Sequence, residues 1–265
     1  MSSKGAPWLG AGGSTAPGTT IKSARELESM REAGRVVART FQRLFEAVVP
    51  GVRTRDLDRL ARREIASHGA VPSFLGYLGY PAAVCVSINE EVVHGIPGDR
   101  AIEDGDIVSM DLGAIAGGFH ADAAQTVIAG SATPEKTALL EATRAALAQG
   151  IAAARPGNRV GDISAAIERT VEAAGLSVVR EYVGHGIGRN LHEPPQVPNY
   201  GPPGQGPLLK VGMTLAIEPM VNMGGWKTRV LEDGWTVVTA DGKASAHFEH
   251  TVAITDEGPV VLTLP

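Results

Sequence analysis

The predicted elements repeat once along the chain, and this repeat limits the fold more than any other feature of the sequence. Two helical segments followed by strand-like segments make up the first half, and the same order returns in the second. Pro50-Gly51-Val52-Arg53 is matched 106 residues later by Pro156-Gly157-Asn158-Arg159, and Asp56 is matched by Asp162. Because the matches keep one order, we expect an internally duplicated fold, with helices on one side of a sheet in each half. The halves, about 21–130 and 131–265, would meet at a pseudo-twofold seam that offers a cleft.

Capping and stop signals delimit four helices. Ser23 and Glu26 have the spacing of a capping box, and the helix that they begin stops at Pro50-Gly51. Thr133-Pro134 begins the third helix, which reaches about Ala154, while the second and fourth helices are expected over about 55–69 and 161–174. Strand-like runs are 84–88, 107–112, 119–128, 176–182, 214–218, 235–239 and 247–254, with Asp241-Gly242 as a hairpin turn and the Pro- and Gly-rich stretch 194–208 as an inserted loop.

Residues 107–128 are expected to form a hairpin with a tight turn at 116–118. If the turn centres on Ala116-Gly117, Asp111 lies directly opposite Asp122. Two like charges in opposite positions repel, since their side chains begin only about 5 Å apart. A divalent cation between the two carboxylates would relieve this repulsion. The alternatives are a neighbouring Lys or Arg, or a register that differs by one residue.

The bulk properties exclude several classes of protein. The chain has 265 residues, of which 43% are hydrophobic and 20% are charged, and this suits one large domain or two closely packed halves. A formal net charge of −5 argues against a general nucleic-acid binder and against a membrane-surface protein. Cys85 is the single cysteine, so the chain can form neither an internal disulfide nor a thiolate zinc cluster. Residues 1–20 lack the apolar core of a signal peptide, so we expect a flexible Gly/Ser/Pro-rich tail and a cytoplasmic protein.

Four acids and one histidine form a candidate metal-binding set. The repeat brings Asp111 and Glu218 into corresponding positions, and Asp122, Glu249 and the glycine-flanked His185 complete the set. One divalent ion would leave two negative charges uncompensated in an apolar cleft, whereas two ions balance the four carboxylates. Paired ions that share a water are a hydrolytic device, and oxygen-rich ligation favours Mn²⁺, Fe²⁺ or Co²⁺, with Zn²⁺ as an alternative. Each acid alone is also compatible with a solvated strand end, and His185 with a hydrogen bond in the core.

Several short motifs resemble those of the type I methionine aminopeptidases, in that family's order and spacing over residues 21–265. They are His94-Gly-Ile-Pro, Met110-Asp111, Ala121-Asp122, Gly184-His185-Gly-Ile-Gly, Ile217-Glu218-Pro-Met and Phe248-Glu249-His-Thr. The resemblance implies a single catalytic domain with the pita-bread fold, an α+β fold with antiparallel sheets covered by helices and a dinuclear metal site at the seam. It also implies removal of the initiator methionine from nascent proteins with a small second residue, by attack of a metal-bridging hydroxide on the first peptide bond.

The resemblance assigns the metal ligands one by one. Asp111 would chelate one ion, and Asp122 and Glu249 would bridge both ions. His185 and Glu218 would complete the coordination of one ion.

Three residues would take part in the chemistry by the same matching. His94 would contact the scissile amide nitrogen, and His192 would donate to the carbonyl oxygen and stabilise the oxyanion. Glu218 would move a proton from the attacking water to the leaving amine. Taken without the family pattern, either histidine would be interpreted as a solvent-facing loop residue.

An apolar slot would hold the methionine side chain, since a thioether suits soft, aromatic surroundings. By family position it would be lined by Tyr77, Tyr80, Cys85, Leu191 and Trp235, although these residues are equally compatible with an ordinary core. Four positions depart from the family's usual residues and bear on the pocket or on the support of the metal ligands: Leu191 stands in place of Phe, Phe74 in place of a smaller residue, Val93 in place of Cys and Ala123 in place of Thr.

Three related classes of protein are alternatives, and each would leave a different feature in the sequence. Prolidase and aminopeptidase P share the architecture but carry an added N-terminal domain, for which no room is expected ahead of Ser23. A type II methionine aminopeptidase would carry a helical insertion in the second half, which the sequence does not suggest. A non-catalytic relative that binds the ribosome or a partner protein would lose metal ligands, whereas all five are present. We expect a monomer that binds N-terminal Met-small-residue peptides, with ribosome association through the 1–20 tail left open.

Overall fold

The computed structural model describes residues 16–265, so most of the predicted N-terminal tail, 1–20, lies outside the described residues. Among residues 16–265, no helix combines the length and the apolar character that crossing a bilayer requires.

All four predicted helices are present. They are α1 (Ala24–Ala47), α2 (Thr54–Ser67), α3 (Pro134–Ala153) and α4 (Val160–Ala173). The predicted capping box begins α1: the backbone N–H of Glu26 donates to Ser23 Oγ, and the backbone N–H of Ser23 donates to Glu26 Oε2 at 3.0 Å. Thr133 caps α3 ahead of Pro134, as predicted. Helix α1 ends at Ala47, before Pro50, because the residue preceding a proline is driven out of the helical conformation.

The strands form four small sheets, and every strand pairing among residues 16–265 is antiparallel. One sheet holds β1 (Val71–Pro72), β2 (Cys85–Ile88), β4 (Ile107–Ala116) and β5 (Phe119–Ile128). The largest holds β15 (Gly258–Val261), β14 (His250–Thr255), β9 (Thr214–Ile217), β7 (Gly184–Gly186) and β8 (Glu193–Val197) in that order. The others hold β13 (Ser245–His247), β10 (Met220–Asn222) and β6 (Ser177–Val178), and β11 (Thr228–Val230), β12 (Val237–Thr239) and β3 (Glu91–Val93). A 3₁₀ turn, η1 (Tyr77–Gly79), lies between β1 and β2.

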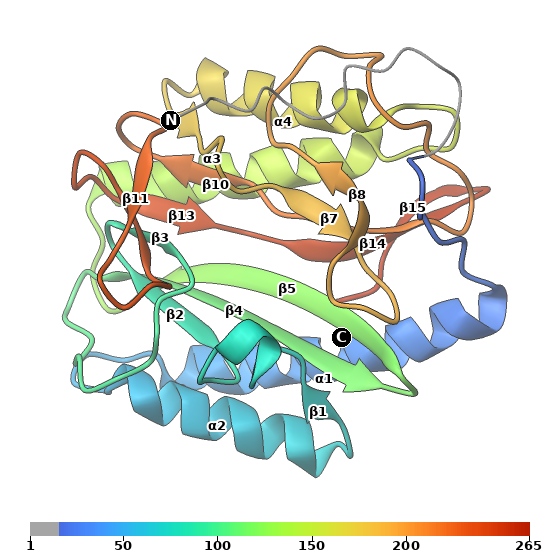
Figure 1. Ribbon diagram of the computed structural model, residues 1–265. Coiled ribbons are helices and arrows are strands. Elements are labelled where there is room, and N and C mark those ends of the chain that lie inside the picture. The colour runs from blue at the N-terminus through green and yellow to red at the C-terminus, as the bar shows by residue number, and fades with distance from the viewer. Residues whose placement is uncertain (1–15) are drawn as a thin grey trace.

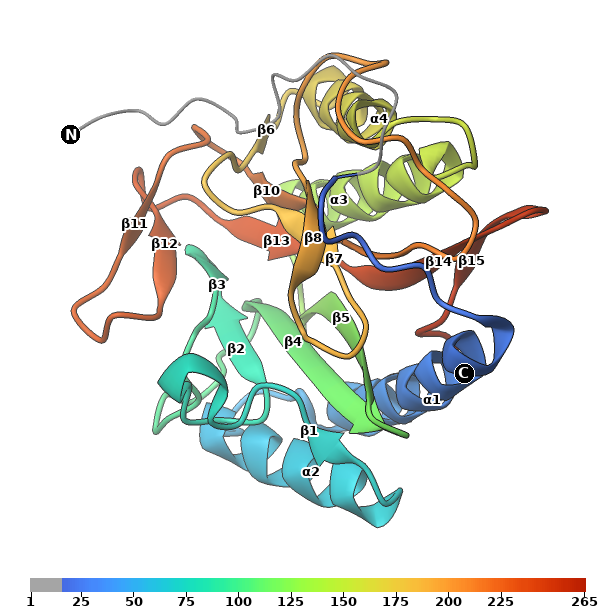
Figure 2. The same cartoon turned by 45° about the vertical axis from the view of Figure 1, so that its right-hand side comes forward.

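The helices lie outside and the sheets inside (Figures 1 and 2). Helix α1 packs against the β4–β5 hairpin, with α2 beside it against β1. On the opposite side of the molecule, α3 packs against β10 and β13, and α4 packs against β6 and β8. Each helix pair has its own apolar core: Leu44, Leu57 and Met110 are fully buried in the first, and Leu215 and Ile163 in the second. The two halves therefore meet through their strands, and the space between the strands is where a site can form.

The predicted pairing of Asp111 with Asp122 is wrong by two positions. Asp111 faces Ala124, and Asp122 faces Gly113. The turn falls on Gly117-Gly118, where both residues have positive φ (57° and 78°), as a two-residue hairpin turn requires and as Ala116 would resist. Since side chains alternate along a strand, a shift of two positions leaves both acids on the same face, as diagonal neighbours.

Other strand predictions also need correction. The Asp241-Gly242 turn does not join paired strands, because β12 pairs with β3 and β11 whereas β13 pairs with β10. The expected strand 247–254 is divided between β13 and β14, with Phe248 and Glu249 between them. Only two residues of 176–182 form a strand, β6. The stretch 194–208, predicted as an inserted loop, contains most of β8.

Candidate metal centre and substrate pocket

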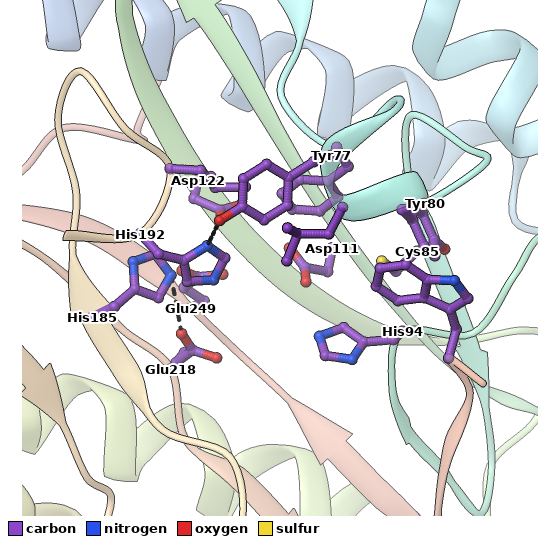
Figure 3. A pocket seen from close by; sticks show the side chains of 14 residues that line it. Tyr77, Tyr80, Cys85, His94, Asp111, Asp122, His185, His192, Glu218 and Glu249 are labelled. Atoms are coloured by element: carbon purple, nitrogen blue, oxygen red, sulfur yellow. Dashed lines mark hydrogen bonds and ion pairs between the residues drawn. The ribbon is translucent and has the colours of Figure 1, made fainter. Parts of the chain in front are cut away.

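A cavity of about 220 Å³ opens where the two halves meet, and every residue predicted for the site lines it (Figure 3). Phe74 and Leu78 complete the wall. The predicted lining residues are Tyr77, Tyr80, Cys85, His94, Asp111, Asp122, His185, Leu191, His192, Glu218, Trp235 and Glu249.

The acids reach the cavity from both halves of the chain. Asp111 lies on β4 and Asp122 on β5, so the hairpin of the first half provides two carboxylates. Glu218 directly follows β9, and Glu249 lies in the gap between β13 and β14. His185 lies at the centre of the short strand β7. Five side chains from five different strands or strand ends thus line one cavity.

Three of the four carboxylates keep an oxygen without a partner. Asp111 Oδ1, Asp122 Oδ1 and Glu249 Oε1 are buried and accept no hydrogen bond from any group in residues 16–265. Buried acceptors are nearly always paired, so these oxygens indicate a missing donor or cation. Donor atoms of Asp122, His185 and Glu249 all lie within 4.8 Å of one another. This donor set, rich in carboxylate oxygen with one imidazole nitrogen, fits a divalent metal.

Burial and mutual repulsion shift the pKa values of the four acids. Burial raises the pKa of Asp122 to about 7. Burial first, and then the neighbouring carboxylates, raise the pKa values of Asp111, Glu218 and Glu249 well above the ordinary range. Within residues 16–265 no Lys or Arg forms an ion pair with Asp111 or Asp122, so the alternative of a neutralising Lys or Arg fails there. The ion-pair contacts of Glu218 come from His185 and His247. In the metal-free protein the raised pKa values favour the protonated, neutral acids, and a bound divalent cation would compensate the charges of the ionised form.

His185 is held in the tautomer that a metal ligand needs. Its Nδ1 atom lies 2.9 Å from the carbonyl oxygen of Gly186, which can only accept, so Nδ1 carries the proton and donates. The Nε2 atom is left with a lone pair and lies 3.5 Å from Glu218 Oε1. Burial lowers the pKa of His185 to about 3, which keeps the imidazole neutral.

Thr251 supports Asp122 from the other half of the chain. Its hydroxyl accepts from the backbone N–H of Asp122 at 2.9 Å and donates to the backbone carbonyl of Asp122 at 2.8 Å. The backbone N–H of Glu249 donates to the carbonyl of Ala124 at 2.8 Å, which joins the same two segments. Asp122 is therefore held through its backbone, although Ala123 beside it offers no hydroxyl.

His94 and His192 flank the acids on opposite sides (Figure 3). His94 has a positive φ of 61°, which is unusual for a residue with a side chain and often marks a functional position. The next residue holds this conformation in place: the carbonyl of Gly95 accepts from Tyr80 Oη at 2.9 Å, and its N–H donates to Ser87 Oγ at 3.1 Å. Burial lowers the pKa of His94 to about 4, so its ring is neutral.

His192 is packed between two rings. It stacks on Tyr77 with centroids 5.3 Å apart and lies 4.1 Å from the centroid of His185. Its Nδ1 atom is 2.8 Å from the hydroxyl of Tyr77. Burial lowers the pKa of His192 as well.

The other end of the cavity is apolar. Tyr80 and Trp235 meet edge to face with centroids 5.1 Å apart, and Cys85 lies in the same buried cluster. Burial raises the pKa of the Cys85 thiol, which makes it a small apolar group and no nucleophile. Of the departures from the family pattern, Phe74 and Leu191 line the cavity, whereas Val93 packs in a separate cluster with Met220.

Sequence reasoning missed three residues at this site. Leu78 lines the cavity yet is 80% exposed, and nothing in its local sequence marks it. Thr251 hydrogen-bonds to the backbone of Asp122, which lies 129 positions earlier in the chain, so no local pattern predicts this contact. His247 is buried with Nε2 3.7 Å from Glu218 Oε2, and its place two residues before Glu249 could have indicated a shared face. Two other histidines, His120 and His250, interact with the hydroxyls of Ser73 and Thr263, respectively.

Several known proteins resemble this chain in sequence and in fold. A model of metallopeptidase family M24 matches residues 28–256. Methionine aminopeptidase 1 of Bacillus subtilis (strain 168) is 54% identical over 242 residues, which are 91% of this chain and 98% of the relative. The crystal structure of methionine aminopeptidase from Thermotoga maritima has a TM-score of 0.92 and 48% identity, covering 93% of this chain and 100% of that chain. Prolidase from Pyrococcus furiosus, with a TM-score of 0.77 and 24% identity over 92% of this chain and 65% of its own, shares the fold alone. The chain therefore has the pita-bread fold and belongs to the methionine aminopeptidases of metallopeptidase family M24.

Proposed function

We propose that this metallopeptidase removes the initiator methionine from nascent polypeptides whose second residue is small. The observation that carries this proposal is a single cavity with a cluster of acids and histidines at one end and an apolar aromatic slot at the other. A free N-terminal amine and a scissile amide suit the polar end, and a thioether side chain suits the slot.

Two divalent ions, Co²⁺, Mn²⁺ or Fe²⁺ with Zn²⁺ as an alternative, are the cofactors we propose. They would be held by Asp111, Asp122, His185, Glu218 and Glu249, whose four carboxylates balance two ions in charge. When bound, such ions polarise the scissile carbonyl and lower the pKa of a coordinated water.

Glu218 is the proton carrier in this proposal. Its carboxylate is buried, and burial, together with the nearby Asp122, raises its pKa well above the usual range, which makes it a stronger base than a solvated carboxylate. It would accept a proton from the attacking water and deliver it to the amine that leaves. His247, 3.7 Å from Oε2, lies on the other side of the same carboxylate.

His192 would stabilise the oxyanion through Nε2. A neutral imidazole donates from Nε2 only if Nδ1 accepts, and the Tyr77 hydroxyl, 2.8 Å from Nδ1, is placed to donate to it. Tyr77 would thereby set the tautomer of His192. His94, which is neutral and faces the acids from the opposite side, would contact the scissile amide nitrogen.

The slot would select the methionine side chain by its size and polarisability. Tyr80, Cys85 and Trp235 form its aromatic and sulfur-lined wall, and Tyr77, Leu191 and Phe74 also line it. Leu191 makes one wall of the slot aliphatic where the family usually has Phe, and Phe74 is larger than the residue usual at its position. We expect the preference for methionine to persist with a changed tolerance of longer or branched first residues.

The decisive experiment removes metal with a chelator and then titrates Mn²⁺ or Co²⁺ while methionine release from Met-Ala-Ser is measured. Met-Leu-Ser and Ala-Pro-Ser are the controls. Metal-dependent cleavage that favours Met-Ala-Ser supports the proposal. Cleavage of Ala-Pro-Ser instead would assign a proline peptidase, and metal binding without cleavage of any peptide would favour a binding scaffold.

We also propose that residues 21–265 form one catalytic domain of two related halves, about 21–130 and 131–265. Corresponding turns support this proposal: Arg53 forms an isolated bridge with Ala101, and Arg159 forms the equivalent bridge with Leu208. We further propose that the enzyme is a monomer that meets nascent chains in the cytoplasm, with ribosome association as a question for co-sedimentation.

A further inference from the structure

Lys22 and Glu193 form an ion pair in which both side chains are only 5% exposed. The Nζ atom of Lys22 lies 2.8 Å from Glu193 Oε2. The other Lys and Arg ion pairs among residues 16–265 leave at least one side chain substantially exposed. A buried ion pair is a poor source of stability, because desolvation offsets the attraction, so this pair needs another explanation.

Both oxygens of Glu193 are engaged, so its side chain has one orientation. Oε2 accepts from Lys22 Nζ and from the hydroxyl of Thr20 at 2.6 Å, and Lys22 Nζ also contacts that hydroxyl. Oε1 accepts from the backbone N–H of Asn190 at 3.1 Å. These bonds lower the pKa of Glu193 in spite of its burial. Glu193 thus closes the loop 190–193 on one side and anchors it to the segment before α1 on the other.

The segment that carries Lys22 is itself fixed. The backbone N–H of Lys22 donates to the carbonyl of Gly212 at 2.7 Å, just before β9, and Figure 2 shows this stretch running beside β8 into α1. Gly188 packs directly against the ion pair: a Cβ there would lie 2.8 Å from Lys22 Nζ and 2.7 Å from Glu193 Oε1. The pair therefore fills the space under the loop that joins β7 to β8.

That loop carries His192. Residues 187–192 belong to no strand, and His192 directly precedes Glu193. The ring of His192 contacts Tyr77 and His185. We propose that Lys22 and Glu193 act as a positioning unit that holds His192 against Tyr77 at the cavity. This inference rests on the proposed role of His192, and it assigns a part in the reaction to a residue from the start of the chain.

The test separates positioning from stability with an apolar replacement of the pair. Lys22→Met or Glu193→Leu alone leaves one buried charge unpaired and is expected to lower Tm. The double variant Lys22→Met/Glu193→Leu removes both charges at similar volume, so its Tm should return close to that of the wild type. Its loop has lost the anchor, however, and we expect kcat for Met-Ala-Ser to stay at least about tenfold low while KM changes less than about threefold. Lys136→Met is the matched control and should leave kcat unchanged, because Lys136 donates to the carbonyl of Gly105 and neither residue lines the cavity.

Two further measurements decide whether the double variant loses kcat because His192 is displaced. In a His192→Ala background the double replacement should lower kcat no further, because residues that act through one group are not additive. In the metal-free protein, the His192 ring signal in NMR, identified by its loss in His192→Ala, should move toward that of free histidine in the double variant. This spectrum does not depend on the aminopeptidase activity, so the failure of the proposed function would be seen separately, as an inactive wild type. Recovery of kcat together with Tm, full additivity with His192→Ala, or an unmoved His192 signal would each overturn the inference.

Discussion

Replacing Asp122 by Asn is expected to stabilise the metal-free protein at alkaline pH. The Asp122 side chain is buried at 4% exposure, and its pKa rises from 3.8 to about 7 because ionisation there is opposed by desolvation. Each pKa unit corresponds to about 1.4 kcal/mol, so ionised Asp122 destabilises the folded protein by about 4 kcal/mol. The Asn amide stays polar and buried and offsets part of this gain, which leaves an expected stabilisation of about 2 to 3 kcal/mol.

The effect has a defined pH window. Since the pKa of Asp122 is higher in the folded protein than in the unfolded chain, the folded state binds more protons between about pH 4 and 7. The free energy of unfolding of the metal-free wild type should therefore fall as pH rises through this window. Below about pH 4 Asp122 is protonated and its destabilising effect is absent, and the effect is complete above about pH 7. The Asn variant lacks this group, and it also removes a charge that, after burial, raises the pKa values of Glu218 and Glu249, so its pH profile should be flatter.

Urea unfolding in the presence of a chelator, at about pH 5 and about pH 8, measures the difference. Asp256→Asn, at an exposed turn, is the control and should follow the wild-type profile. Saturating Mn²⁺ should stabilise the wild type strongly at about pH 8 and the Asp122→Asn variant much less, because one ligand is lost. Parallel pH profiles for the wild type and Asp122→Asn would refute the view that burial raises the pKa of Asp122 in the metal-free protein.

Three other predictions concern the cavity. Glu218→Gln should lower kcat for Met-Ala-Ser at least about 100-fold in metal-loaded enzyme, the usual scale for a lost proton carrier, and near-normal turnover would remove its role. Tyr77→Phe removes the hydroxyl 2.8 Å from His192 Nδ1 and should lower kcat about fivefold with an unchanged Tm; an effect on KM alone would contradict its role in setting the tautomer. Cys85, buried with a raised pKa, should resist iodoacetamide at about pH 8 until the protein is unfolded, as followed by intact mass; rapid alkylation of the folded protein would show that the slot opens.

Local signals in the sequence were sufficient for the helices. The capping box at Ser23 and the Thr133-Pro134 start act within four residues, and the structure begins α1 and α3 at those points. The acids and histidines could also be identified from their motifs, because each motif combines a ligand type with flanking glycines or apolar strand residues. For these features the interacting atoms are neighbours along the chain, so the pattern of residues contains the information.

Contacts between distant segments decided the rest. The hairpin register depended on whether Ala116 or Gly118 occupies the turn, and the positive φ of Gly117 and Gly118 placed Asp111 opposite Ala124. The strand predicted at 247–254 divided at Phe248, where Glu249 leaves the ladder and enters the cavity.

The supports of the site are the clearest case. Thr251 holds Asp122 across 129 positions, and Lys22 reaches Glu193 across 171. Neither pair has a local signature, because a hydroxyl or an ammonium group gains its partner only when folding removes competing water and brings the segments together. The sequence by itself identified the acids and histidines that we propose to bind metal and transfer protons. Only the tertiary structure decided which buried groups orient them, since burial and long-range pairing are properties of the folded chain.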